Sequence, residues 1–223
     1  MYHPANGANY IAIYLSPFLA RDAVAGVTAG QWLVRLHGQQ VRNGRFHGWI
    51  ERDDPRPVGR LGPKELWNFP SFFSQRSNVD DSSVGSLGCG NNNVTVANLH
   101  AARDRIHITS SQGPTRDGRF KPDVAAPGTD IVAAKGFAGP NDLWVSMTGT
   151  SMASPMVTGV TALMLAREPK LTAAQIQGII QRTAQPLPGA DFTWANDAGY
   201  GRIDPEACLR EAGEVFKRKD LTQ

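Results

Sequence analysis

Cysteines and long apolar runs are both scarce in this sequence, and each shortage excludes a class of protein. Two cysteines in 223 residues, Cys89 and Cys208, are too few for a disulfide-rich scaffold or a four-cysteine zinc site. One disulfide and two free thiols both fit this count. No apolar stretch approaches the length of about 18 residues that a membrane-spanning helix needs. The sequence therefore predicts neither a disulfide-stapled domain nor a membrane partner.

An excess of charge of one sign is also missing. The net charge is only +3, and the densest basic run lies in the terminal segment 217–223, which has the composition of a solvated, charged tail. The composition therefore gives no reason to expect a nucleic-acid partner. The start of the chain lacks a basic segment followed by an apolar one, so we expect no signal peptide there. The cellular location is left open.

What the sequence does contain is the composition of a globular protein, arranged in two unlike parts. Hydrophobic residues make up 41% and charged residues 19%, which is too apolar a balance for a disordered chain. In the first part, residues 1–90, period-2 alternation of apolar residues predicts strands of a small antiparallel sheet. Asn43-Gly44 is a hairpin signal between two of them, and residues 53–90 have the composition of an irregular connection. The expected strands are 10–15, 32–36 and 46–50.

The second part, residues 91–216, mixes short apolar strands with helices. Strands are expected at 94–97, 123–125 and 130–134, and the apolar stretch 152–166 suits a buried helix. A capping box formed by Thr172 and Gln175 predicts a second helix. Asp204 and Pro205 are typical of the start of a last helix, which we expect to extend through Phe216. This succession predicts an α/β arrangement of layers.

Residues 149–155, Gly-Thr-Ser-Met-Ala-Ser-Pro, form a turn of small residues that leads into the buried helix. A serine at a helix start usually acts as an N-cap, whose side chain accepts a hydrogen bond from the backbone. It can instead be a nucleophile, because the unpaired N–H groups and the dipole at a helix N-terminus stabilise an oxyanion. The local sequence alone leaves both interpretations of Ser151 open.

Four segments favour the nucleophile. Residues 149–155, GTSMASP, resemble the nucleophile motif of the subtilisin-like serine proteases, or subtilases. Residues 110–114, SSQGP, are similar to their SSxGP segment, and residues 121–128, KPDVAAPG, to their KPDxxAPG segment. Residues 199–204, GYGRID, resemble the GYGxVD turn that follows the catalytic core. Since the four occur in the family's order, the chain is identified as a member of this family. Met156 replaces a histidine that is usual there but is not catalytic.

The resemblance implies the fold and the function. The expected fold is a subtilisin-like parallel sheet with flanking helices, of which residues 91–216 are the C-terminal portion. Residues 1–90 would be a β-rich insert with its connection. The implied function is serine-type endopeptidase activity on polypeptide substrates, with Ser151 as the nucleophile and no cofactor required for catalysis.

Two members of the catalytic triad are absent from the chain. Subtilases place the triad in the order Asp, His, Ser, with the first two in D[ST]G and HGTxVAG motifs. Neither motif occurs in residues 1–150. His37 and His47 are each followed by glycine, but the rest of the motif is missing. We therefore assign no catalytic Asp or His, and expect this chain alone to be inactive. The N-terminal half of the domain would come from the same precursor or a separate chain.

The resemblance also implies an asparagine that helps to stabilise the oxyanion. Asn91 and Asn92 follow Gly90, but Asn93 begins what resembles the strand after the asparagine turn. Larger bacterial subtilases can carry a β-rich insert between that turn and this strand, and residues 9–52 fit such an insert. The asparagine is then expected before Met1, with Asn91 and Asn92 as the alternatives inside the chain.

Two other functions compete with a protease. One is a pseudoprotease that keeps the fold only for binding. The other is a β-rich module that binds a protein or glycan through Tyr14, Trp32 and Trp49. Aromatic residues in an alternating strand are more often part of a core, which favours the protease.

Carboxylates raise two further expectations. Subtilases often carry structural calcium, but the acidic pairs 53–54 and 80–81 lack the spacing of a calcium loop, so we expect solvated turns there. Asp123 lies between Pro122 and three apolar residues. We expect its carboxylate to be partly buried and hydrogen-bonded to the backbone, in a structural role.

Overall fold

The computed structural model describes residues 2–3, 8–13, 30–41, 44, 46–50, 56–68, 71–74 and 81–215. They belong to two compact units, Met1–Gly48 and Trp49–Gln223. The first unit holds two short strands, β1 (Tyr2–His3) and β2 (Ala8–Asn9), which pair antiparallel with Tyr2 opposite Asn9. The second unit holds the remaining elements, including the four motif segments.

The three strands expected between residues 10 and 50 are not formed in the described part of the chain. Residues 10–13, 31–41 and 46–50 carry no strand, while 14–15 and Asn43 of the expected hairpin lie outside the described residues. The aromatic residues expected in a core are exposed instead, Trp32 by 54% and Trp49 by 53%. The prediction is wrong because alternation makes a strand only where another layer covers its apolar face.

A hairpin occupies part of the segment that we expected to be irregular. Strand β3 (Arg56–Leu61) pairs antiparallel with β4 (Lys64–Asn68). The chain reverses at Gly62 and Pro63, where Gly62 has a left-handed φ of +60° that glycine adopts without steric cost. A Gly-Pro pair is typical of turns, but the sequence analysis did not use it to predict a hairpin here.

The sheet of the second unit contains the predicted parallel pair. Strand β5 (Val96–His100) pairs in parallel with β7 (Val124–Pro127), Val96 lying opposite Val124. The short strand β6 (Arg105–Ile106) pairs antiparallel with the other edge of β5. Two 3₁₀ helices, η1 (Ser86–Cys89) and η2 (Ala101–Arg103), lie in the connections. The α/β fold expected from the sequence is confirmed.

Three helices form, and the last two begin where their caps predicted. Helix α1 spans Thr150–Arg167, α2 spans Ala173–Thr183 and α3 spans Pro205–Ala212. The capping box is present: the Gln175 N–H donates to Thr172 Oγ1 at 3.3 Å, and the Thr172 N–H donates to Gln175 Oε1 at 2.8 Å. Asp204 caps α3. This helix ends at Ala212, before Gly213, and Phe216 lies outside the described residues.

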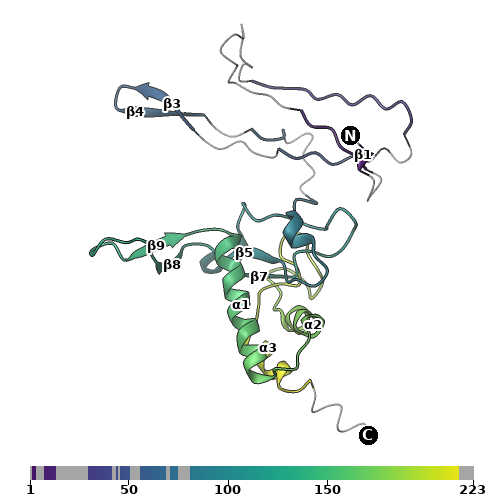
Figure 1. Cartoon of the computed structure of the whole chain (residues 1–223), viewed down its shortest axis with the longest axis vertical. Helices are drawn as coiled ribbons and strands as arrows, with labels where there is room; N and C mark the ends of the chain where they lie inside the picture. The colour runs from purple at the N-terminus through teal and green to yellow at the C-terminus, as the bar shows by residue number, and fades with distance from the viewer. Residues whose placement is uncertain are drawn as a thin grey trace. The chain divides into compact units, whose positions relative to one another are not determined.

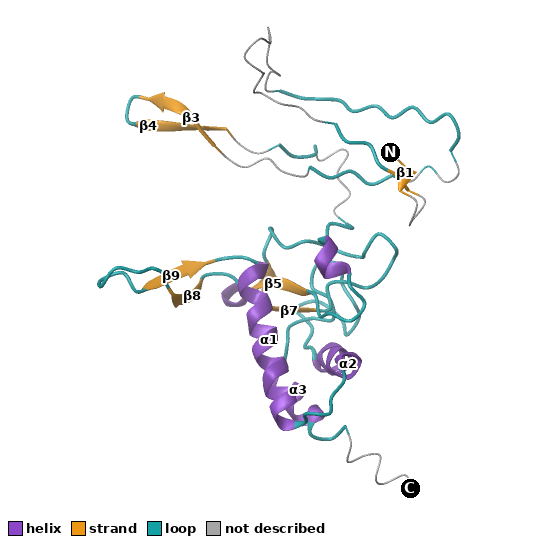
Figure 2. Cartoon of the chain, in the orientation of Figure 1, coloured by secondary structure: helices purple, strands orange, loops and turns teal. Residues whose placement is uncertain are grey.

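The main core lies between the β5–β7 pair and these helices. Figure 2 shows α1, α2 and α3 gathered beside β5 and β7. The apolar stripe predicted for α2 is buried in it. Members of this core include Val124, Ala126, Ala153, Val157, Val160, Met164, Ile176, Ile179, Ile180 and Cys208. A smaller group formed by Ala97, Leu99 and Ala125 lies on the opposite face of the sheet.

A second hairpin leads directly into α1. Strand β8 (Ile131–Ala134) lies within the strand expected at 130–134. It pairs antiparallel with β9 (Trp144–Met147), a strand that the sequence did not predict. In Figure 1 it extends away from the sheet and helices of its unit. The hairpin places Thr148 and Gly149, the last residues before α1, beside the loop that follows β7.

Both cysteines are free thiols, which decides between the two alternatives left by their number. Cys208 is buried in α3, and burial raises the pKa of its thiol. Among the described residues, no helix has the length and apolar character needed to cross a membrane.

Candidate active site

Ser151 occupies the second position of α1. Gly149 is the N-cap residue, in an extended conformation with no side-chain capping bond, so the N-cap interpretation of Ser151 is wrong. Ser151 is exposed, and its hydroxyl forms no hydrogen bond with any of the described residues. The hydroxyl is therefore available for chemistry rather than engaged in ending the helix.

The backbone around Ser151 offers free donors. The N–H groups of Met152 and Ala153 donate to the carbonyl of Gly149, at 3.0 and 3.3 Å. Those of Thr150 and Ser151 have no acceptor within the described part of the chain. Because unpaired N–H groups and the helix dipole both favour negative charge, this end of α1 can stabilise an oxyanion formed next to Ser151.

The loop after β7 holds the turn that carries Ser151. The Gly149 N–H donates to the Gly128 carbonyl at 2.8 Å, and the Asp130 N–H donates to Thr148 Oγ1 at 2.9 Å. Gly128 has no room for a side chain. A Cβ there would lie 2.6 Å from Asn98 Oδ1, 2.7 Å from the Gly149 oxygen and 2.8 Å from Ala153 Cβ. The motif at 121–128 therefore packs directly under the motif at 149–155.

A cavity of about 320 Å³ connects three of the motif segments. Ser111 comes from the segment 110–114, Pro122 from 121–128 and Thr150 from 149–155. The rest of the lining comes from the loop around η1 and from the start of β5: Val84, Gly85, Ser86, Leu87, Gly88, Thr95 and Val96. The cavity is thus adjacent to the residue that precedes Ser151.

The fourth motif packs against the other edge of β7. Gly199 has a left-handed φ of +67°, and a Cβ there would come within 2.5 Å of the Asp123 backbone. The Tyr200 N–H donates to the Asp123 carbonyl at 3.0 Å, and the Ala125 N–H donates to the Gly201 carbonyl at 2.8 Å. Segments that are far apart in the sequence therefore meet around β7.

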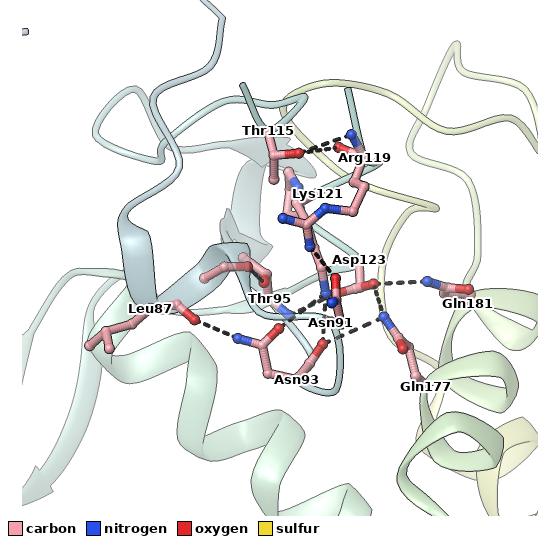
Figure 3. Close-up of polar contacts among 12 residues, drawn as sticks. Leu87, Asn91, Asn93, Thr95, Thr115, Arg119, Lys121, Asp123, Gln177 and Gln181 are labelled. Carbon is pink, nitrogen blue, oxygen red and sulfur yellow. Dashed lines mark hydrogen bonds and ion pairs between the residues drawn. The ribbon is translucent and has the colours of Figure 1, made fainter. Parts of the chain in front are cut away.

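Asp123 is the centre of a buried polar network, drawn in Figure 3. Its carboxylate accepts hydrogen bonds from the Thr95 N–H at 2.7 Å and from Lys121 Nζ at 2.6 Å. The side-chain amides of Gln177 and Gln181 donate to it at 2.8 Å each. The backbone bond expected for Asp123 is confirmed, and the burial is complete rather than partial.

The sequence reasoning missed the partners of Asp123. Lys121 is almost fully buried and also donates to the Asn93 carbonyl at 2.7 Å. Gln177 and Gln181 are four residues apart on α2, so they share one helix face beside the apolar stripe. That spacing was the available signal, but only the tertiary contact identifies Asp123 as their acceptor.

No triad partner for Ser151 emerges among the described residues. His37 and His47 belong to the first unit. In the second unit, His107 Nδ1 shares a hydrogen bond with the Thr109 hydroxyl at 2.8 Å. No described histidine or carboxylate is hydrogen-bonded to Ser151. The expected absence of the triad Asp and His from this chain stays a prediction.

The alternative oxyanion residues are engaged elsewhere or lie beside another cavity. Asn91 Oδ1 accepts a hydrogen bond from the Arg119 guanidinium at 2.7 Å, and Asn92 lines a cavity along α1. For calcium, the described residues contain no group of three or more His, Cys, Asp or Glu that could hold a metal ion. Asp81 is exposed, while Asp53, Asp54 and Asp80 lie outside the described residues.

Comparison with known proteins agrees with this geometry. A sequence model described as "Subtilase family" matches residues 72–201. The serine protease AprX of Bacillus subtilis (strain 168) is 28% identical over 149 residues, covering 58% of this chain and 32% of AprX. The minor extracellular protease Vpr of the same organism is 39% identical over 129 residues, covering 54% of this chain and 16% of Vpr. This chain therefore spans about a third or less of these relatives.

A solved structure supports the fold. The CspB protease of Clostridium perfringens superposes with a TM-score of 0.53 at 22% sequence identity. The match covers 66% of this chain and 31% of that protein. This chain therefore corresponds to about a third of the length of that protein.

Proposed function

Because this chain belongs to the subtilase family, we propose that it is the nucleophile-bearing C-terminal part of a subtilisin-like serine endopeptidase. Ser151 Oγ attacks the scissile carbonyl of a polypeptide substrate, and the Ser151 N–H is one donor to the oxyanion. The carrying observation is the exposed, unbonded hydroxyl beside two free N–H groups at the start of α1. The proposed chemistry uses protein groups alone and requires no cofactor.

The proposed reaction requires a general base, and none of the described residues has been assigned that role. A serine hydroxyl stays protonated at neutral pH, so it becomes an effective nucleophile only when a base removes its proton. We infer that the Asp and His come from an N-terminal half of the catalytic domain, in the same precursor or a separate chain. That half would also supply the oxyanion asparagine.

The outer side of α1 supports this inference. Met156 and Leu163 on this helix are 46% and 55% exposed, whereas Val157, Val160 and Met164 are buried in the core. A helix that is apolar on all sides is normally enclosed by protein. The proposed N-terminal half would cover the exposed side, so its docking and the completion of the triad would occur together.

Labelling with a fluorophosphonate tests the proposal. In a protein that contains both this chain and the proposed N-terminal half, the reagent should modify Ser151. Ser151→Ala should abolish labelling, and the matched control Ser154→Ala, on the next turn of the same helix, should keep it. A pseudoprotease or a binding module would show no labelling. Labelling that persists in Ser151→Ala would contradict the proposed nucleophile.

The chain by itself provides a second test. Residues 1–223 alone should cleave no peptide, because they lack the base, and their uncovered apolar surface should promote self-association. Mixing with the separately purified N-terminal half should restore cleavage. If residues 1–223 alone cleave a peptide at a rate that Ser151→Ala abolishes, a histidine of this chain is the base, and His37 is the first to mutate.

A further inference from the structure

Asn98 is a polar residue at a core position of β5. Its side chain is completely buried, and in the parallel pair it lies opposite Ala126, a member of the main core. Strand positions of this kind usually hold apolar residues, and buried amides need hydrogen-bond partners. An amide at this place therefore requires an explanation other than packing.

Only one end of this amide is paired. Asn98 Oδ1 accepts a hydrogen bond from Thr129 Oγ1 at 3.1 Å, whereas Nδ2 has no acceptor within the described part of the chain. The cost of burying a donor without an acceptor is at least as large as the gain from one hydrogen bond. The Asn98 amide therefore adds little to the net stability of the fold.

The paired end of the amide lies close to residues 148–151, which we call the nucleophile turn. Asn98 Oδ1 is so near Gly128 that a Cβ on Gly128 would be 2.6 Å from it. The Gly128 carbonyl in turn accepts the Gly149 N–H at 2.8 Å, two residues before Ser151. A short series of contacts thus runs from Asn98 through Thr129 and Gly128 to Gly149.

We propose that Asn98 is a positioning residue for the nucleophile turn. Its Oδ1 binds the Thr129 hydroxyl and so fixes the loop after β7, whose Gly128 carbonyl holds Gly149 at the start of α1. The amide does not touch the substrate. The effect on the turn rests on the geometry alone, while the effect on Ser151 reactivity rests on the proposed function.

The test compares variants that remove the Thr129–Asn98 bond with one that keeps it. Thr129→Val is isosteric but lacks the hydroxyl, Thr129→Ser retains it, and Asn98→Ala removes the acceptor. The first readout is hydrogen exchange at the Gly149 amide in residues 1–223. We expect exchange to be about tenfold faster in Thr129→Val and Asn98→Ala, and close to wild type in Thr129→Ser.

The second readout is the rate of fluorophosphonate labelling of Ser151 in the complemented protein, measured with the melting temperature. Labelling should slow in Thr129→Val and Asn98→Ala and be retained in Thr129→Ser, while Asn98→Ala should melt no earlier than wild type. A purely structural role would instead lower the melting temperature of Asn98→Ala together with its labelling.

Unchanged Gly149 exchange in Thr129→Val, or equal exchange in Thr129→Val and Thr129→Ser, would overturn the proposal. If Asn98→Ala fails to fold, the Gly149 exchange rates of Thr129→Val and Thr129→Ser still test the proposal. If the wild-type protein is not labelled, the proposed function fails, and the exchange measurement decides the positioning role by itself.

Discussion

The two units of this chain both carry periodic apolar patterns, one strand-like and one helical, and the outcomes are opposite. In the second unit, Ile179 and Ile180 of α2 are fully buried against neighbouring elements. In the first unit, alternating residues such as Leu33 form no strand and are largely exposed, Leu33 by 80%. The comparison shows that periodicity predicts which residues share one face of a strand or helix. That face becomes part of a core only where a second layer of structure packs against it.

Two helices of the second unit repeat this contrast at smaller scale. Helix α2 has one apolar stripe, and the described residues bury it completely. Helix α1 is apolar on most sides but is covered on one, so Met156 and Leu163 remain exposed. A single neighbouring layer is enough to bury the apolar side of an amphipathic helix. Helix α1 is apolar on most sides, so burying its apolar residues requires neighbours on both sides.

The largest expected effect concerns the chemistry that distinguishes the second unit from the first. In the complete enzyme, Ser151→Ala should lower turnover by several orders of magnitude and leave folding nearly intact, because the exposed hydroxyl makes no structural bond. Peptide hydrolysis and thermal melting are the measurements. A mutant that retains more than about a tenth of wild-type turnover would exclude Ser151 as the nucleophile.

The buried network should give the largest effect on stability. Asp123→Ala leaves the Lys121 ammonium buried without its carboxylate, and breaking a buried ion pair in this way should cost about 3–5 kcal/mol of unfolding free energy. Urea denaturation measures the change. The control is Asp142→Ala, which removes an exposed ion pair with Lys135 and should leave the stability nearly unchanged. If Asp123→Ala has the melting temperature of the wild type but loses catalysis, the structural role assigned to Asp123 is wrong.

A matched pair of apolar truncations tests the comparison itself. Ile179→Ala removes a fully buried side chain and should cost about 2–5 kcal/mol, whereas Leu33→Ala should change the unfolding free energy by no more than about 0.5 kcal/mol. Both values come from denaturant unfolding of residues 1–223. A similar cost for the two would mean that the first unit buries its apolar residues after all.

Two glycines, one in a crowded position and one in an open position, should respond oppositely to substitution by alanine. Gly128→Ala places a Cβ within 2.6–2.8 Å of three other atoms, so we expect a loss of about 1–3 kcal/mol and displacement of the nucleophile turn. Gly159→Ala, inside α1, meets nothing within 4 Å and should stabilise the chain by up to about 1 kcal/mol. Thermal melts of both variants check the signs, and a neutral Gly128→Ala would contradict the close packing.

The smallest expected effect is on thiol reactivity. Burial raises the pKa of Cys208, so its reactive thiolate is disfavoured in the folded chain. Iodoacetamide at mildly alkaline pH should modify Cys208 more slowly than the half-buried Cys89, and the difference should disappear in denaturant. The folded state favours the neutral Cys208 thiol. Its contribution to the free energy of unfolding is therefore fully present below the pKa of the unfolded state and is lost as the pH rises through the pKa of the folded state. Equal rates in the native chain would contradict the burial of Cys208.

The local signals in the sequence identified most of the second unit. Thr172 and Asp204 marked the starts of α2 and α3, and the short apolar runs located β5, β7 and β8 to within three residues. These elements are set by hydrogen bonds and contacts between near neighbours in the chain, so their residues carry the information. The hairpin of β3 and β4 had a signal in Gly62-Pro63, but β9 lies in a segment without a distinctive pattern.

The sequence by itself determined the family, through four motifs in order, and Ser151 as the expected nucleophile. Only the tertiary structure decided that Gly149 caps α1, that Gln177 and Gln181 bind Asp123, and that Asn98 lies under the nucleophile turn. The physical reason is the distance along the chain: the Asp123–Gln181 contact spans 58 residues. Such contacts depend on how β5, β7 and the helices pack, and no local pattern specifies that packing.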